Sequence, residues 1–352
     1  MKVVIPSSRA INLKYLEPLI EYGADFIIID DSEGSIKFKH PGFRFFNRRD
    51  IKKILGKSEV SIPRRNGACR NFGFYMAWKE CADDEIIIAL DDDCEITDSS
   101  FPESVDANFS ARERAVTSFN GLHFNILDLY QEIPENLFPR GFPYAARLNY
   151  KPWIFGKAVK ATTKFNLGLW KGVFDINAID KIYGGEWSHP QARLKSESIL
   201  VPEGTLISVC SMNMHFRKEI IPAIYQLPMH VEVIPGWPVD RYGDIWGGFI
   251  LKTLMDLRGD NMTVGAPMIN HIKDGDFQRN IWQEHLCHLL NEEFIDFLRS
   301  STGYIEKSDY MSMMFQLNEY FIKNKSRLSK PLKLYFDHLT VCLDSWCRIL
   351  NC

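Results

Sequence analysis

The 352-residue sequence predicts an α/β fold: a Rossmann-type sheet flanked by helices, followed by a helical C-terminal extension. Three observations support this prediction. Apolar runs alternate with helical patterns near the start of the chain, as in βαβ units. One apolar run, EIIIAL, is continuous, which is typical of a strand covered on both faces. From about Ile305 onward the patterns are helical only.

The N-terminal elements follow from these patterns in chain order. We expect a strand at residues 3–5, a helix at 13–22, a strand at 26–29, a helix at 67–81 and a strand at 85–90. The second strand ends in Asp30 and Asp31, and the third runs directly into Asp91, Asp92 and Asp93. In doubly wound sheets, ligands bind outside the carboxyl ends of the strands. The three consecutive aspartates are therefore expected to face a cleft.

The middle of the chain, residues 108–198, is rich in Pro, Gly and aromatic residues and has weak periodicity. It predicts long loops and short strands around a site. Beyond it we expect a strand at 205–210 and helices at 218–225 and 244–257. Since no internal repeat or low-complexity linker interrupts the chain, the predicted organisation is a catalytic domain at 1–300 and a helical extension at 301–352.

The composition excludes several classes of protein. A net charge of -3, with both signs mixed along the chain, argues against a nucleic-acid partner. Eight cysteines without CxxC pairs indicate free thiols in a reducing compartment. The N-terminal apolar run is too short for a signal peptide, and no stretch approaches the roughly 20 apolar residues of a membrane span. We expect a cytoplasmic protein, at most peripheral to a membrane.

The aspartates at 91–93 are the strongest candidates for chemistry. On an extended strand end, Asp91 and Asp93 would project to the same side, because side chains alternate with period two. Two carboxylates could then share Mg²⁺ or Mn²⁺, which would neutralise charge on a departing diphosphate. Asp92 would point the other way, towards a ribose or a backbone donor. The alternative is a solvated acidic loop without a ligand.

Three further segments contain candidate residues. His271 follows the apolar segment GAPMIN and could complete a metal site with Asp91 and Asp93, although a lone histidine is more often structural. In RYGDIWGG, Asp244 lies beside Trp246 and two glycines, and could take sugar hydroxyls or merely begin a helix. Arg140 and Arg147, in PRGFPYAAR, could clamp phosphates or be surface charges.

Taken in order, these segments resemble the reversibly glycosylated polypeptide family, best known as plant UDP-arabinopyranose mutases. The likeness runs over roughly residues 3–290 and rests on many ordered motifs. They are VIPSSRAINLKYLEPL, FNRRDIKKILG, ACRNFGF, LDDDC, PRGFPYAAR, GLW, GTLISVCSMNMHF, RYGDIWGG and WQE. The resemblance implies a GT-A-like mixed sheet and an enzyme that interconverts the pyranose and furanose forms of a UDP-pentose.

The resemblance also implies roles for individual residues. The family becomes glycosylated on one arginine, which carried over here is Arg147, with Asp244 as the carboxylate that orients it and takes its proton. Asp31 and Arg70 would bind the nucleotide and diphosphate, together with Asp91 and Asp92. A divalent metal, Mn²⁺ or Mg²⁺, would lie on Asp91, Asp93 and His271.

Several departures from the family pattern leave the function open. The paired acids near RYGDIWGG are here Gly243 and Asp244, so one carboxylate is missing, and Asp175 and Asn177 stand where the plant pattern has two acids. A UDP-sugar mutase is the leading hypothesis. A glycosyltransferase to a saccharide or lipid acceptor and a non-catalytic nucleotide-sugar-binding subunit are the alternatives. A homo-oligomer is open by analogy, and the basic stretch 323–333 is either a solvated helix face, which we favour, or a contact with an anionic membrane.

Overall fold

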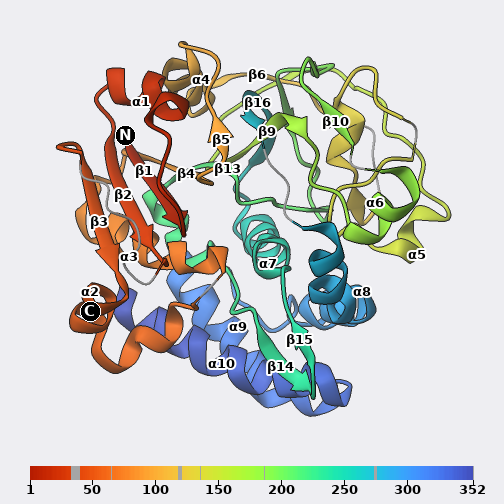
Figure 1. Ribbon diagram of the computed structural model, residues 1–352. Coiled ribbons are helices and arrows are strands. Elements are labelled where there is room, and N and C mark those ends of the chain that lie inside the picture. The colour runs from red at the N-terminus through yellow and green to blue at the C-terminus, as the bar shows by residue number, and fades with distance from the viewer. Residues whose placement is uncertain are drawn as a thin grey trace.

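A ten-stranded mixed sheet organises the computed structural model, which describes residues 1–32, 40–64, 66–117, 121–134, 136–185, 187–272 and 276–351 (Figure 1). The sheet has the order β11-β16-β9-β13-β4-β1-β2-β3, and β10 and β5 pair with β9 and β16. With helices around the sheet, the architecture confirms the predicted α/β fold class. Cys352 lies outside the described residues; the seven other cysteines are buried and unpaired.

The N-terminal half of the sheet is parallel and matches the predicted βαβ order. Strands β1 (Lys2–Ser7), β2 (Asp25–Asp30), β3 (Phe43–Asn47) and β4 (Ile86–Leu90) lie in the order β3-β2-β1-β4. Every residue of β4 is buried, as its continuous apolar run requires. The carboxyl ends of β1, β2 and β4 therefore meet at one edge of the sheet.

The other half contains strands that the sequence pattern did not predict. Strand β13 (Asn213–Arg217) lies antiparallel between β4 and β9 (Phe165–Val173), and β16 (Met262–His271) runs parallel to β9. The prediction of loops and short strands at 108–198 is therefore wrong for β9, which has nine residues, eight of them buried. Gly168 interrupts its apolar pattern because a Cβ there would lie 2.2 Å from the Asn213 amide nitrogen. Buried polar residues and a glycine therefore interrupted the apolar pattern by which this core strand could have been predicted.

Several predicted helices are shorter or tighter than expected. The helix expected at 13–22 is a 3₁₀ turn, η1 (Leu13–Leu16), followed by α1 (Glu17–Glu21). The helix expected at 67–81 is η3 (Gly67–Arg70) followed by α3 (Asn71–Glu80). The helix expected at 218–225 is the 3₁₀ helix η5 (Lys218–Ala223), which contains Pro222. The strand expected at 205–210 shortens to β12 (Leu206–Ile207).

The remaining helices surround the sheet or close its loops. They are α2 (Arg48–Leu55), α4 (Phe101–Asn108), α5 (Tyr144–Arg147), α6 (Ala178–Gly184), α7 (Gly243–Arg258) and α8 (Phe277–Ser300), with the 3₁₀ helices η2 (Gly56–Ser61), η4 (Ile126–Leu129) and η6 (Lys325–Arg327). The short strands are β5 (Cys94–Glu95), β6 (Arg112–Arg114), β7 (His123–Phe124), β8 (Val159–Ala161), β10 (Ser188–His189), β11 (Ser198–Leu200), β14 (Val231–Ile234) and β15 (Trp237–Val239).

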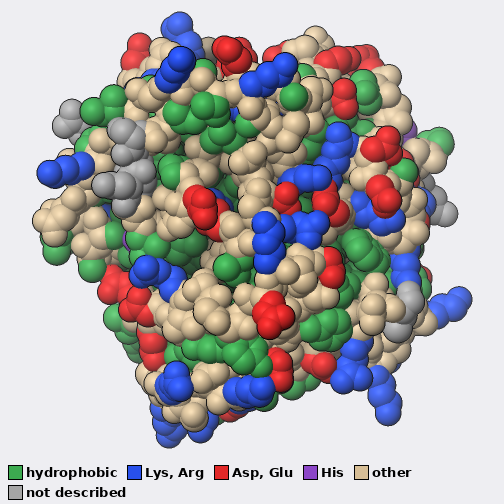
Figure 2. Space-filling view, turned by 180° about the vertical axis from the view of Figure 1, so that it is seen from behind, with side chains coloured by type: hydrophobic (Ala, Val, Ile, Leu, Met, Phe, Trp, Pro, Cys, Tyr) green, Lys and Arg blue, Asp and Glu red, His purple; other side chains and the backbone are tan. Residues whose placement is uncertain are grey.

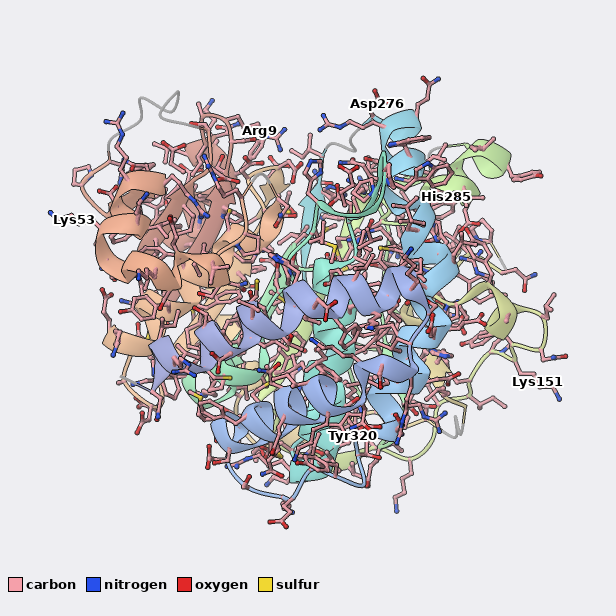
Figure 3. All side chains as sticks on the ribbon, turned by 90° about the horizontal axis from the view of Figure 1, so that it is seen from below. Arg9, Lys53, Lys151, Asp276, His285 and Tyr320 are labelled. Atoms are coloured by element: carbon pink, nitrogen blue, oxygen red, sulfur yellow. The ribbon has the colours of Figure 1, made fainter. Side chains whose placement is uncertain are left out.

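The predicted C-terminal helices are α9 (Tyr310–Asn324) and α10 (Lys330–Leu350). They contact each other, and in Figure 3, seen from below, they run across the molecule in front of the sheet. Trp346 of α10 is fully buried and donates its indole N–H to the Pro222 carbonyl at 3.1 Å, while Trp78 donates to the Leu350 carbonyl at 2.8 Å. The extension therefore packs into the same core as the sheet, and its boundary at residue 300 stays a prediction.

The surface carries charges of both signs, as the sequence composition predicts. Figure 2 shows acidic and basic side chains interspersed over one face, without a large field of one sign. In the described parts of the chain, no helix combines the length and the apolar composition needed to cross a bilayer.

Candidate active site

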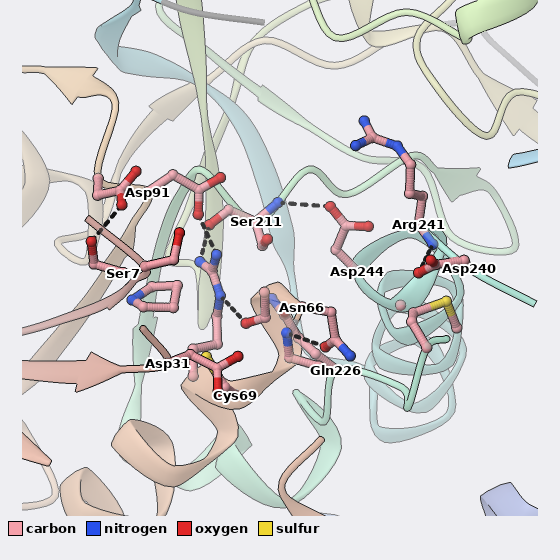
Figure 4. Close-up of a pocket in the computed structure, with 18 of the residues that line it drawn as sticks. Ser7, Asp31, Asn66, Cys69, Asp91, Ser211, Gln226, Asp240, Arg241 and Asp244 are labelled. Carbon is pink, nitrogen blue, oxygen red and sulfur yellow. Dashed lines mark hydrogen bonds and ion pairs between the residues drawn. The ribbon is translucent and has the colours of Figure 1, made fainter. Parts of the chain in front are cut away.

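A cavity of about 590 Å³ opens at the carboxyl ends of β1, β2 and β4. Figure 4 shows Ser7, Asp31 and Asp91 on one side of it and Asp240, Arg241 and Asp244 on the other, with Ser211 between them. Its described lining residues that carry charge are Arg9, Asp31, Arg70, Asp91, Asp92, Asp93, Arg140, Asp240, Arg241 and Asp244. The volume falls within the range of small-molecule and cofactor sites.

The aspartate triad lines the cavity, but its backbone is not the extended strand end that we expected. Strand β4 stops at Leu90, and the Cys94 N–H donates to the Asp91 carbonyl at 3.3 Å, which closes a turn. The argument from alternating side chains therefore does not apply. All three carboxylates nevertheless face the cavity. Burial raises the pKa of Asp93, and the negative charge of Asp91 acts in the same direction.

Two arginines neutralise the triad from different depths. The buried Arg70 side chain pairs with Asp91, donates to the Ser211 carbonyl at 2.6 Å and donates to the Gly67 carbonyl at 3.0 Å. Arg9, whose side chain is 45% exposed, pairs with Asp92 and with Asp93, the latter at 2.8 Å. The Ser7 hydroxyl also donates to Asp92. Arg70 is thus a fixed part of the wall, whereas Arg9 lies at the rim.

His271 ends β16 close to the triad without lining the cavity. It pairs in register with Cys94 of β5, directly after Asp93. Its Nδ1 lies 2.7 Å from the Val173 carbonyl oxygen, which can only accept, so Nδ1 carries a proton and donates it to this bond. Within the described residues, no group of three or more His, Cys, Asp or Glu side chains is close enough together to hold a metal ion. The predicted metal ligands Asp91, Asp93 and His271 therefore lie in the same region of the structure but do not form a metal site in it.

Arg140 lies buried in the opposite wall between two carboxylates. Its Nε donates to Asp175 at 2.9 and 3.1 Å, and its two terminal nitrogens donate to Asp244 at 2.7 and 3.2 Å. It also donates to the carbonyl of Arg241, a residue in the left-handed region with φ of 64°. Burial alone would lower the pKa of Arg140, but the charges of Asp175 and Asp244 outweigh it and raise the pKa well above its usual value.

Arg147 lies outside this cavity. It closes α5, donates to both oxygens of Asp180 at 3.0 and 2.9 Å, and stacks over the rings of Tyr144 and Phe138. The two terminal nitrogens of Arg147 are thus occupied by Asp180, while its Nε is buried without a hydrogen-bond partner among the described residues. Of the predicted site residues, the structure brings Asp31, Arg70, Asp91, Asp92, Asp93 and Asp244 to one cavity, and Arg147 and His271 are not among its lining residues.

Other site residues had no signal in the sequence strong enough to single them out. Arg9 lies in a loop after β1. Asp240 accepts a hydrogen bond at 2.9 Å from the side chain of Gln283, which lies on α8. In the sequence, Asp175 appears only as a departure from the family pattern, yet in the structure it holds Arg140. Their grouping depends on long-range packing.

Comparison with known proteins finds similar sequences over almost the whole chain. The sequence model of the family described as "Reversibly glycosylated polypeptide" matches residues 1–351. UDP-arabinopyranose mutase 1 of Arabidopsis thaliana is 28% identical over 354 residues, covering 98% of this chain and 90% of the relative. UDP-arabinopyranose mutase 3 of the same plant is 30% identical over 310 residues, covering 86% and 78%. Probable UDP-arabinopyranose mutase 1 of Pisum sativum is 29% identical over 361 residues, covering 100% and 91%. The match thus extends past the motifs into α9 and α10.

Proposed function

The chain belongs to the reversibly glycosylated polypeptide family, and from that premise we propose that it is a nucleotide-sugar mutase which interconverts the pyranose and furanose forms of a UDP-pentose such as UDP-arabinose. The similar plant proteins carry the name UDP-arabinopyranose mutase. The observation that carries the proposal is the buried Arg140, held by Asp244 and Asp175 in the wall opposite the Asp91–Asp93 triad.

The cavity geometry favours Arg140 over Arg147 as the arginine that takes the sugar. Arg140 lines the cavity and contacts Asp244, whereas Arg147 is engaged by Asp180 and two aromatic rings elsewhere. A guanidinium is a poor nucleophile while it is protonated. In this position, however, a carboxylate lies within hydrogen-bond distance of the attacking nitrogen and can take a proton as the new bond forms.

The proposed cycle conserves atoms and electrons. A terminal nitrogen of Arg140 bonds to the anomeric carbon, the bond from that carbon to the β-phosphate oxygen breaks, and its electron pair leaves with UDP while the nitrogen proton passes to Asp244. The nitrogen lone pair then expels the ring oxygen, which takes the proton held by Asp244. The 4-hydroxyl attacks the resulting C=N carbon and returns a proton to Asp244, so the ring closes in the furanose form. UDP finally attacks the anomeric carbon, and Arg140 regains its proton from Asp244.

The opposite wall suits the nucleotide and diphosphate. Asp31, Asp92 and the fixed Arg70 side chain line that wall, and arginine is well matched to phosphate oxygens. Asp91, Asp93 and His271 are residue types that suit Mn²⁺ or Mg²⁺ and would be its ligands, but as they lie in the described structure they are not close enough together to hold an ion. When bound, such a cation would stabilise negative charge on the departing diphosphate.

The test uses the full chain with Mn²⁺ and a panel of UDP-pentoses and UDP-hexoses. Products are separated by chromatography, and the protein is analysed by intact mass and peptide mapping. We expect a furanose product and one pentosyl group on Arg140. Arg140→Lys should abolish both signals, while Arg147→Lys, the matched control, should keep the modification, provided both variants retain the wild-type circular dichroism spectrum.

Three other results would contradict the proposal in different ways. A pentosyl group on Arg147 would restore the assignment made from the sequence resemblance. Transfer of sugar to an added saccharide or lipid, without a protein adduct, would identify a glycosyltransferase. Nucleotide-sugar binding without any turnover would identify a binding subunit.

A further inference from the structure

A second cavity, of about 540 Å³, lies between α2, η2, the start of β14 and α10. Its described charged lining consists of Arg48, Lys57, Arg64, His230 and His338 on the basic side, with Glu59 as the acid. Three permanent positive charges against one carboxylate leave a balance of +2 before either histidine is protonated. We call this the basic cavity. None of its lining residues was singled out as functional by the sequence.

Arg48, which lines the basic cavity, has buried nitrogens that lack hydrogen-bond acceptors among the described residues. One terminal nitrogen donates to the Ile62 carbonyl at 2.6 Å. Its Nε and other terminal nitrogen are buried and have no hydrogen-bond partner among the described residues. Burial lowers the pKa of Arg48 below its usual value; the charge of Asp31 opposes this shift, and the charge of Arg64 adds to it. Buried charged donors without acceptors are costly and call for a missing ligand, water or ion.

We propose that the basic cavity binds a phosphate-type oxyanion, either inorganic phosphate or the phosphate of a small phosphorylated molecule. An anion would supply acceptors for the unpartnered nitrogens of Arg48 and relieve its repulsion with Arg64. The planar guanidinium fork matches phosphate oxygens and is the usual choice for recognising them. A cavity of this volume accommodates a phosphorylated metabolite as readily as the free ion.

The basic cavity adjoins the candidate active site without being part of it. Met229 lines both cavities, and His230 of the basic cavity lies 3.3 Å from Asp240, which lines the first. An anion beside His230 would therefore change the electrostatic potential at Asp240, a carboxylate of the candidate active site. The basic cavity would bind such an anion whether or not the first cavity turns over a nucleotide-sugar.

The experiment measures binding of inorganic phosphate and of glucose 1-phosphate to the full chain by isothermal titration calorimetry at low ionic strength. Arg64 is exposed, so Arg64→Gln tests the cavity without endangering the fold. Arg48→Gln is the second test, accepted only if its thermal midpoint stays near that of the wild type. Arg49→Gln, an exposed neighbour on α2 that lines neither cavity, is the matched control, and Arg9→Gln probes the first cavity.

We expect saturable binding that weakens by about tenfold or more in Arg64→Gln and in Arg48→Gln, because each removes a charge-assisted contact. Arg49→Gln and Arg9→Gln should bind as the wild type does. The tighter of the two probes identifies whether the ligand is free phosphate or a phosphorylated molecule. No saturable binding, equal weakening in Arg49→Gln, or loss in Arg9→Gln with retention in Arg64→Gln would each overturn the proposal.

Discussion

Arg140 donates to both carboxylate oxygens of Asp244, with nitrogen–oxygen distances of 2.7 and 3.2 Å, while its Nε is held by Asp175. The two carboxylates differ in position. Asp244 lines the cavity, whereas Asp175 does not, so Asp175 holds the guanidinium from behind. The positive charge of Arg140 is thus held between Asp244, which lines the cavity, and Asp175, which lies behind it in the protein. This asymmetry suggests different roles for the two acids.

The first prediction separates these roles by two matched variants. Asp244→Asn removes the proton acceptor proposed for the attacking nitrogen, so turnover of a UDP-pentose should fall by about 10²-fold or more. Asp175→Asn leaves that acceptor in place, so its effect on turnover should be smaller. The measurement is steady-state kinetics with both folds checked by circular dichroism. Equal losses in the two variants would show that Asp244 only holds Arg140 in position.

The second prediction concerns stability in acid. The charge of Arg140 outweighs burial and lowers the pKa of Asp175 below its usual range, with Lys181 and Cys210 contributing in the same direction. An aspartate has a pKa of about 3.9 in unfolded chains. A carboxyl whose folded pKa is depressed stabilises the protein fully above its unfolded pKa, and that stabilisation is lost as pH falls towards the folded value.

Stability of the wild type should therefore decline below about pH 4 more steeply than that of Asp175→Asn. Urea denaturation at a series of pH values between about 5 and 2 measures both slopes. Parallel slopes would mean that the Asp175–Arg140 pair does not control acid stability.

How far the sequence predicts this fold depends on how each strand is buried. Strand β4 was predictable because its five residues are apolar and covered on both faces. Strand β9 was not, since Asn166 binds the His215 ring at 3.1 Å inside the core and Gly168 makes room for Asn213. Polar pairs and close approaches between distant segments break the apolar pattern that predicts strands. Only the folded chain shows that these polar residues satisfy one another.

The candidate site shows the same division. Asp91 and Asp244 were predictable because each lies at the end of a strand or the start of a helix. Which of Arg140 and Arg147 faces the cavity was not, because the chain turns sharply at Gly141, with φ of 84°, before α5 begins. A Cβ on Gly141 would also lie 2.4 Å from Ile245 of α7. The direction of that turn is set by packing against a distant helix.

The third prediction compares the two arginines that face the triad. Arg70→Met removes a buried cation and leaves two backbone carbonyls and part of the Asp91 charge without a partner, so unfolding free energy should fall by about 2–4 kcal/mol. Arg9→Met removes a half-exposed partner of Asp92 and Asp93, so the loss should be below about 1 kcal/mol. Urea midpoints of both variants provide the measurement. A larger loss for Arg9→Met would contradict the assignment of Arg70 to the fixed wall.

The fourth prediction concerns the acid that the family has and this chain lacks. Gly243 occupies the first position of α7, and the resemblance in the RYGDIWGG segment implies a second acid there in the plant pattern. A Cβ there would lie 2.6 Å from the Leu227 carbonyl oxygen, and Leu227 also donates its N–H to the Gly243 carbonyl at 3.0 Å. Because the obstacle is backbone, it cannot move aside as a flexible side chain would.

Gly243→Asp should therefore not restore a family-like pair of acids but destabilise the fold, and Gly243→Ala should already lose about 1–3 kcal/mol through overpacking. The aspartate variant should be the less stable of the two, because it adds a like charge beside Asp244. Thermal midpoints of the wild type and both variants rank the three proteins. If Gly243→Asp were as stable as the wild type and turned over UDP-pentose faster, the fold would accommodate a second acid beside Asp244, and the steric argument would be wrong. A ranking of wild type, alanine and aspartate would instead mean that α7 and the segment at Leu227 have closed together around the glycine, so that Asp244 is the one carboxylate this position can offer to Arg140.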